Sequence, residues 1–381
     1  MIRQIALGIG RAAASILLPR PTLPFDPGRI EKILIYATFG IGDTILFIPA
    51  LKAIRRRFPK ARIVLLSGAS WTGELVSGHL ADEIRKYIPD HWEIYKLAAQ
   101  VRKERFDLLI GSYLCLSRHL VELTLLSGIP WRAGHVSGPN WSSDADFLFN
   151  IPAVFRDADH SLDIWFRLAE ALGCEPGDRQ PSLPIDSEAE AFAERFFRDN
   201  GLSEKDWTLA VQVGTARTQD WKQWDVKKLA QTCDRLLEDR GTRIILLGSA
   251  EHKNTLDELL GLMRHSPVVA LGKTSLKQSA ALIRKCRAAL CNDSGMMHLS
   301  AAVGVPVVAV FGPTDPRRTA PVGDGHILVR KEVSCSPCYA LPDLSASAAK
   351  SCAHRNCLAF IAPEDVVAAV HKIRDDAKDR V

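Results

Sequence analysis

The chain contains 381 residues, of which 47% are hydrophobic and 24% are charged, and its 49 basic and 44 acidic side chains give a formal net charge of +5. This length and balance are typical of two soluble globular domains and exclude a disordered or fibrous protein. No apolar run reaches the roughly 20 residues needed to cross a bilayer, which argues against a membrane-spanning protein. Nucleic acid is not an expected partner, because the basic residues are not interleaved with aromatic ones and no known binding module is present.

The first 30 residues form an extension before the regular pattern begins. Arg3 and Arg11 interrupt its apolar character, which is unlike a secretory signal or a membrane span. One interpretation is a helix lying on a membrane surface, with an apolar face made of Ile5, Leu7, Ile9, Ala13, Ile16 and Leu17. The alternatives are a helix packed on the protein and a disordered leader.

From residue 31 onward, short β-branched runs alternate with longer amphipathic ones. The pattern predicts a helix over 46–58 and buried strands over 32–37, 62–67 and 106–113. Residues 52–62, at the end of this helix, are strongly basic. They form either a solvated helix face or a surface that attracts an anionic partner, such as a membrane or a phosphorylated acceptor.

The alternation fades over 174–186, where prolines, a glycine and charged residues predict a domain boundary. The expected domains are 31–180 and 181–381. In the second, the pattern predicts helices between strands at 208–214, 243–248, 268–272, 287–293 and 305–312. This alternation indicates an α/β fold with two parallel sheets facing a central cleft, where ligands bind at the carboxyl ends of the strands.

Polar residues follow the first predicted strand at such an end. Gly40 and Gly42 keep the turn free of side chains and lead to Asp43. The Asp43 carboxylate either caps the next helix or projects toward a ligand. The third glycine of a dinucleotide-binding fingerprint is missing, which argues against a nicotinamide-dependent dehydrogenase.

The segment 211–224, VQVGTARTQDWKQW, carries several hydrogen-bond donors away from the first strand of the second domain. Backbone amides near a helix start, together with Thr215, Arg217 and Lys222, would suit phosphate oxygens. The alternative is a surface loop that its two tryptophans anchor to the core. Farther on, Glu251 begins a predicted helix, where it either accepts the hydroxyls of a ribose or complements the helix dipole.

The segment 292–298, NDSGMMH, joins a predicted strand to a predicted helix that ends at Gly304. Asp293 or Ser294 can cap this helix, and Gly295 allows a ligand close to the backbone. A polar site at a helix N-terminus is one interpretation. The other interpretation is that His298 is simply a buried residue whose ring nitrogens have hydrogen-bond partners.

Two long stretches resemble glycosyltransferase family 9, the bacterial heptosyltransferases of the lipopolysaccharide inner core. They are FGIGDTILFIPALKAIRRRFP near the front and CNDSGMMHLSAAVGVPVVAVFGPTDP in the second half, and the resemblance extends from about residue 31 to 370. It implies a GT-B fold, with the acceptor held mainly by the first domain and the nucleotide-sugar by the second. It also implies transfer with inversion and without a catalytic metal. The basic segment 52–62 and the N-terminal extension favour an acceptor at the inner face of the membrane, and thus a cytoplasmic enzyme that binds there peripherally.

The resemblance also implies roles for individual residues. Asp43 matches the family's Gly-Asp carboxylate, which would take the proton from the acceptor hydroxyl. Lys222 matches a lysine that would neutralise the leaving phosphates. The implied donor-binding residues are Thr215, Arg217, Glu251, Asp293, Ser294, Gly295 and His298.

Four cysteines lie close together near the C-terminus. Cys335 and Cys338 are spaced as C-x₂-C, and Cys352 and Cys357 are spaced as C-x₄-C. This set, with His354 as a substitute ligand, could hold a structural Zn²⁺. A disulfide and free thiols are the alternatives.

Three functions are compatible with these residues. The first is heptose transfer from ADP-heptose to a lipid A or core oligosaccharide acceptor. The second keeps the family but uses another nucleotide-sugar for a capsule, O-chain or glycolipid. The third is a sugar-nucleotide or glycolipid binding protein without catalysis, against which the presence of both Asp43 and Lys222 argues.

Overall fold

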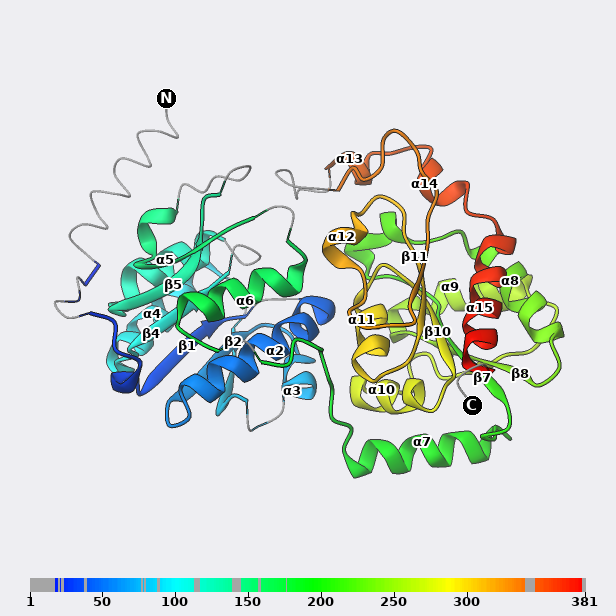
Figure 1. Cartoon of the computed structure of the whole chain (residues 1–381), viewed down its shortest axis with the longest axis horizontal. Coiled ribbons are helices and arrows are strands. Elements are labelled where there is room, and N and C mark those ends of the chain that lie inside the picture. The colour runs from blue at the N-terminus through cyan, green and yellow to red at the C-terminus, as the bar shows by residue number, and fades with distance from the viewer. Residues whose placement is uncertain are drawn as a thin grey trace. The chain divides into compact units, whose positions relative to one another are not determined.

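The computed structural model describes residues 18–19, 21, 24–37, 40–76, 78, 80–87, 90–112, 117–138, 145–156, 159–175, 177–339 and 347–378. The chain divides into two compact units, Met1–Arg179 and Gln180–Val381 (Figure 1). The division falls inside the proline-containing segment 174–186. The surface helix predicted near the N-terminus lies almost entirely outside the described residues. None of the described helices is long and apolar enough to cross a membrane.

The first unit contains a parallel sheet with the strand order β3-β2-β1-β4-β5-β6. Its central strands are made of β-branched and leucine residues that are almost completely buried, as expected for a sheet covered on both faces. The strands are β1 (Lys32–Tyr36), β2 (Arg62–Ser67), β3 (Glu83–Lys86), β4 (Leu108–Gly111), β5 (Trp131–Val136) and β6 (Ile151–Val154).

Helices connect these strands and pack in pairs. α2 contacts α6, and α4 contacts α5. The bounds are α2 (Ile41–Arg57), α3 (Thr72–Leu75), α4 (His91–Glu104), α5 (Arg118–Ser127) and α6 (Ser161–Ala171), with short 3₁₀ turns η1 (Pro27–Arg29) and η3 (Asp146–Leu148).

Helix α2 begins five residues before the predicted helix. Gly40 is its N-cap, and the backbone carbonyl of Gly40 accepts from both the amide (3.0 Å) and the hydroxyl (2.9 Å) of Thr44. Asp43 is therefore the third residue of the helix and not its cap, so the capping alternative is wrong. A carboxylate at this position still lies in the favourable field of the helix N-terminus.

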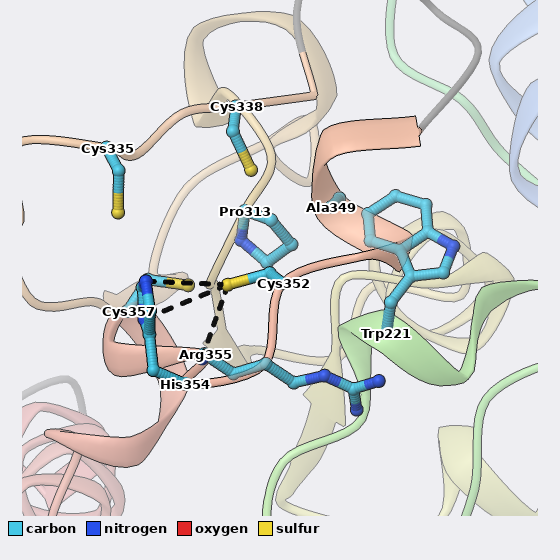
Figure 2. A pocket seen from close by; sticks show the side chains of 9 residues that line it. All are labelled: Trp221, Pro313, Cys335, Cys338, Ala349, Cys352, His354, Arg355 and Cys357. Carbon is cyan, nitrogen blue, oxygen red and sulfur yellow. Dashed lines mark hydrogen bonds between the residues drawn. The ribbon is translucent and has the colours of Figure 1, made fainter.

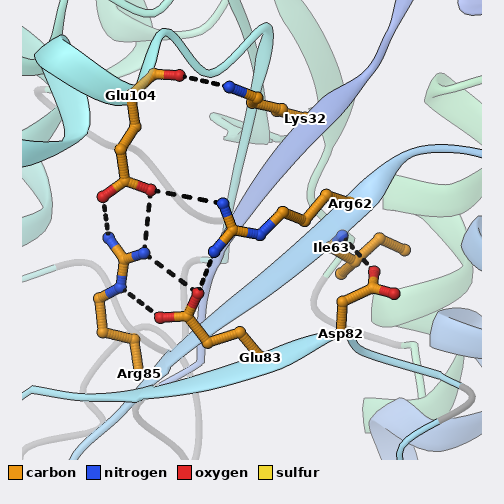
Figure 3. A network of polar contacts seen from close by, with 7 residues as sticks. All are labelled: Lys32, Arg62, Ile63, Asp82, Glu83, Arg85 and Glu104. Atoms are coloured by element: carbon orange, nitrogen blue, oxygen red, sulfur yellow. Dashed lines mark hydrogen bonds and ion pairs between the residues drawn. The ribbon is translucent and has the colours of Figure 1, made fainter.

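The basic segment 52–62 is partly neutralised inside the first unit. Arg55 pairs with Asp82 at 2.5 Å, and Arg62 pairs with Glu83 at 2.5 Å. Glu83 also binds Arg85, which in turn binds Glu104, so the network in Figure 3 ties β2 and β3 to α4. Arg85, which is more buried than Arg62, lowers the pKa of Glu83 through hydrogen bonds, so that carboxylate stays ionised. This use of two arginines weakens the interpretation of the segment as a surface for an anionic partner.

The second unit repeats the architecture with the strand order β12-β11-β10-β7-β8-β9, again parallel throughout. This confirms the predicted α/β fold. The strands are β7 (Trp207–Gln212), β8 (Thr242–Leu247), β9 (Val268–Val269), β10 (Ala288–Asn292), β11 (Val307–Val310) and β12 (Ile327–Val329). Strands β7 and β10 are direct neighbours, so their carboxyl ends lie side by side.

One predicted helix of this unit begins later than expected. The helix expected from about Glu251 starts as a 3₁₀ turn and becomes α-helical only at Lys253. The bounds are α7 (Ser187–Asp199), η4 (Arg217–Lys222), α8 (Val226–Glu238), η5 (Ala250–His252), α9 (Lys253–Leu262), α10 (Leu276–Arg284), α11 (Gly295–Ala302), α12 (Pro316–Thr319), α13 (Ser347–Lys350), α14 (Asn356–Ala359) and α15 (Pro363–Lys378).

Candidate active site

A buried ion pair lies at the carboxyl edge of the second sheet. Lys222 ends η4, which follows β7, and Asp293 follows β10. Lys222 Nζ lies 3.0 Å from Asp293 Oδ2, and the two side chains are 10% and 4% exposed. Asp293 Oδ2 is fully shielded and accepts no hydrogen bond of good geometry within the described residues, so this contact is an ion pair only. Because an unpaired buried charge is costly, each residue depends on the other.

Two aromatic rings also contact the Lys222 ammonium. Nζ lies 5.3 Å from the ring centre of Trp221 and 5.8 Å from that of Tyr339. The two rings contact each other at 5.1 Å between centroids. Cation–π contacts of this kind fix an ammonium without neutralising it. The positive charge of Lys222 is thus positioned by three neighbours and remains shielded from bulk water.

Gln212 joins the ends of β7 and β10. This buried side chain donates from Nε2 to the Gly214 carbonyl at 2.6 Å. Its Oε1 accepts from the backbone amide of Asn292 at 3.2 Å and from the Ser294 hydroxyl at 2.8 Å. Ser294 is the N-cap residue of α11, but its hydroxyl is used by Gln212 and makes no cap bond to the helix. The side chain of Ser294 therefore does not cap α11, which leaves the positive dipole end of the helix for an anion.

The loop after β7 is held by its own hydrogen bonds. The Thr215 hydroxyl donates to the Gln219 carbonyl at 3.0 Å, and the Thr215 amide donates to Gln223 Oε1 at 2.9 Å. His252 Nε2 donates to the Thr215 carbonyl at 2.7 Å, and its ring covers Gly214 so closely that a Cβ there would lie 2.4 Å from it. Thr215 was expected to donate to phosphate, yet its hydroxyl is already used within the loop.

The remaining predicted residues differ in exposure. Arg217, at the start of η4, and Glu251, in η5, are exposed, and Glu251 accepts from the Ser249 hydroxyl at 3.0 Å. Gly295 is the first residue of α11, and His298 is buried one turn into the same helix. Asp43 lies half-buried in the first turn of α2, in the first unit. The second unit thus brings Lys222, Asp293 and the start of α11 to one edge of its sheet.

Two polar residues at this edge were not predicted from the sequence. Gln212 is a polar residue within the otherwise mainly apolar run TLAVQV at 208–213, and this interruption is the signal that could have identified it. Thr314, in the GPTDP turn after β11, is 2% exposed, and its hydroxyl has no hydrogen-bond partner among the described residues. An unsatisfied buried hydroxyl is costly unless a ligand completes it. Beside it, hydrogen bonds from Arg317 hold the pKa of Asp315 below its usual value.

A buried ammonium, an uncapped helix N-terminus and a buried hydroxyl all suit an anionic ligand with several oxygens. Such donors also stabilise negative charge that develops on a leaving group, because they are already oriented before the reaction. The carboxylate of Asp293 adds an acceptor for neutral hydroxyl groups. The site therefore fits a ligand that carries both phosphate and sugar.

Comparison with known proteins agrees with this chemistry. Residues 94–347 match the protein family described as "Glycosyltransferase family 9 (heptosyltransferase)". Lipooligosaccharide heptosyltransferase 2 of Haemophilus influenzae is 35% identical over 323 residues, which cover 78% of this chain and 88% of that protein. Lipopolysaccharide heptosyltransferase 2 of Escherichia coli K12 is 25% identical over 327 residues, with the same coverage of 78% and 88%.

A solved family 9 glycosyl transferase from Veillonella parvula has a similar fold, with a TM-score of 0.75, 21% identity, and coverage of 93% of this chain and 99% of the other. The structural likeness confirms the predicted GT-B fold class. The family description matches well over half of the residues, and the two heptosyltransferase relatives cover more than two thirds of the chain. The chain belongs to glycosyltransferase family 9.

Proposed function

We propose that this protein transfers a heptose from ADP-heptose to a lipopolysaccharide inner-core acceptor made of lipid A and Kdo, with inversion at the anomeric carbon. The observation that carries the proposal is the Lys222–Asp293 ion pair, buried at 3.0 Å beside the uncapped start of α11. Support for the sugar and the acceptor comes from the two relatives above, which are both named as heptosyltransferases of lipopolysaccharide or lipooligosaccharide.

In this proposal the second unit binds the donor. Lys222 and the N-terminal amides of α11 contact the diphosphate, and Gly295 leaves room for its oxygens. Asp293, the ion-pair partner of Lys222, accepts from sugar hydroxyls. The outer contacts are made by exposed side chains, with Glu251 at the ribose and Arg217 at the phosphates. Thr215, Ser294 and His298 shape the loop and helix that hold these groups.

The first unit supplies the base. Asp43 takes the proton of the acceptor hydroxyl while that oxygen bonds to the anomeric carbon and the bond from this carbon to the diphosphate breaks. ADP leaves with the electron pair, and the ammonium of Lys222 stabilises its charge. The helix N-terminus at Asp43 favours the ionised carboxylate that a base requires. Because Lys222 provides this positive charge, the proposed reaction needs no catalytic metal.

An assay with ADP-heptose and a heptose-free inner-core acceptor tests this mechanism. We expect the product linkage, determined by NMR, to have the anomeric configuration opposite to that of the donor. We also expect the rate to change less than about twofold on addition of Mg²⁺ or Mn²⁺, because the charge stabilisation comes from the protein. Retention of configuration, or strong dependence on either cation, would contradict the mechanism while leaving the donor assignment intact.

We further propose that the enzyme works peripherally at the inner face of the cytoplasmic membrane, where a lipid-linked acceptor would be found. The interrupted apolar extension of residues 1–30 supports this role through its sequence alone. Deleting residues 1–28 should lower binding to vesicles that contain anionic lipid in a sedimentation assay. A triple substitution of the exposed Arg56, Arg57 and Lys60 serves as the comparison variant, because it changes the basic helix and leaves the extension intact. Equal vesicle binding by the full and the shortened chain would exclude anchoring by the extension.

A further inference from the structure

Four cysteines of the C-terminal segment line one small cavity in the second unit. Cys335, Cys338, Cys352 and Cys357 surround a space of about 20 Å³ together with His354. Figure 2 shows the sulfur atoms of Cys338, Cys352 and Cys357 turned toward this space, with Cys335 at its side. All four are free cysteines, and the proposed transfer reaction uses none of them.

The local backbone is arranged around these sulfur atoms. The Arg355 amide donates to Cys352 Sγ at 3.4 Å, and Arg355 adopts the left-handed backbone conformation with φ of 42°. A non-glycine residue in this region is uncommon and is held there by its surroundings. Each ring nitrogen of His354 also lies within 3.9 Å of the same sulfur.

We propose that Cys335, Cys338, Cys352 and Cys357 together bind one thiolate-preferring metal ion, zinc or iron. Four sulfur ligands at tetrahedral corners are the arrangement that these two metals prefer. Among the described residues, no group of three or more His, Cys, Asp or Glu side chains is placed to enclose an ion. Binding therefore draws the thiols inward to metal–sulfur distances of about 2.3 Å, which fills the cavity between them. His354 stays outside the ligand set.

The position of this cluster gives the ion a consequence for the active site. Tyr339, next to Cys338, contacts Trp221 with the two rings tilted by 51°, and both rings contact the ammonium of Lys222. The amides of Cys338 and Tyr339 donate to the Pro313 carbonyl at 3.0 and 2.9 Å, beside Thr314. The ion is a structural one that holds Tyr339, and through it Lys222, in place.

The first test measures metal in the full chain, purified with reductant and without added metal. We expect about one equivalent of zinc plus iron by elemental mass spectrometry, as a single four-cysteine site requires. Less than about a tenth of an equivalent, together with failure to take up added Zn²⁺ or Co²⁺, would overturn the proposal. Recovery of the four cysteines as disulfides from the reduced preparation would overturn it too.

Variants locate the ion. C335S changes the most accessible thiol, and C352S changes the one that the Arg355 amide contacts; both should lose the metal and the intense Co²⁺–thiolate absorption. C174A, a buried cysteine of the first unit, is the matched control and should keep both. Because metal content and Co²⁺ spectra need no substrate, they remain informative if the proposed transfer reaction is wrong.

A third measurement tests the structural consequence. C335S should bind ADP about tenfold more weakly than C174A, because removing a support of a positioned group typically costs about that much. Unchanged ADP affinity in a folded, metal-free C335S chain would show that the ion does not position Lys222.

Discussion

Replacing Lys222 with Met is expected to lower kcat by at least about 10²-fold, because the charge on the departing diphosphate would lose its preorganised cation. The substitution also leaves Asp293 buried without the ammonium that lies 3.0 Å from it. Breaking one side of a buried pair typically costs about 3–5 kcal/mol of folding free energy. The single variant should therefore be both less active and less stable.

The double variant K222M/D293N separates these two effects. Replacing the carboxylate with an amide removes the buried charge, so most of the lost stability should return. Activity should not return, because neither substitution restores a positive charge. Chemical denaturation gives the stability of each variant, and steady-state kinetics gives kcat. K227M, which removes an exposed lysine at the start of α8, is the matched control and should behave as the natural chain does.

A double variant that regains activity along with stability would exclude Lys222 from the chemical step. It would leave the lysine with a purely structural role as the partner of Asp293. A loss of activity confined to KM would instead indicate that Lys222 binds the donor equally well before and during transfer.

The second large effect is expected for Asp43→Asn. The amide is nearly identical in shape but cannot accept the acceptor proton, so kcat should fall by at least about 10²-fold. The affinity for ADP, measured by calorimetry, should stay within about twofold, because Asp43 lies in the first unit and the proposed donor contacts lie in the second.

Glu188→Gln gives the comparison for this variant. Glu188 is an exposed carboxylate in the first turn of α7, so the substitution makes the same chemical change in the first turn of another helix. Its activity should be unaffected. Turnover by D43N equal to that of E188Q would remove Asp43 from the mechanism.

Local patterns in the sequence predicted the fold well where one segment determines its own structure. The mainly apolar runs at 32–36 and 288–292 form strands because they can be buried on both faces of a sheet. Helix α11 ends at Ala302, two residues before Gly304, whose φ of 80° suits glycine. The start of α2 was missed by five residues because Gly40 acts as a cap through its backbone, without the side-chain bond that a cap residue usually shows.

Contacts between distant segments were harder to predict. Lys222 and Asp293 were each proposed as site residues, but nothing in a single sequence shows that they meet, since β7 and β10 become neighbours only in the sheet. The same is true of Gln212, whose partners lie 80 and 82 residues later. Arg55 and Arg62 appeared as part of a charged surface because their acidic partners come from β3 and the residue before it.

Transfer from a panel of nucleotide-sugars to a heptose-free inner-core acceptor, followed by mass spectrometry of the product, tests the proposed function most directly. The panel should contain ADP-heptose together with UDP-, GDP- and ADP-linked hexoses. We predict that ADP-heptose gives a product enlarged by one heptose, and that K222M/D293N gives at most about a hundredth of it. A product formed only from another nucleotide-sugar, or tight ADP-heptose binding with no product on any acceptor, would contradict the assignment.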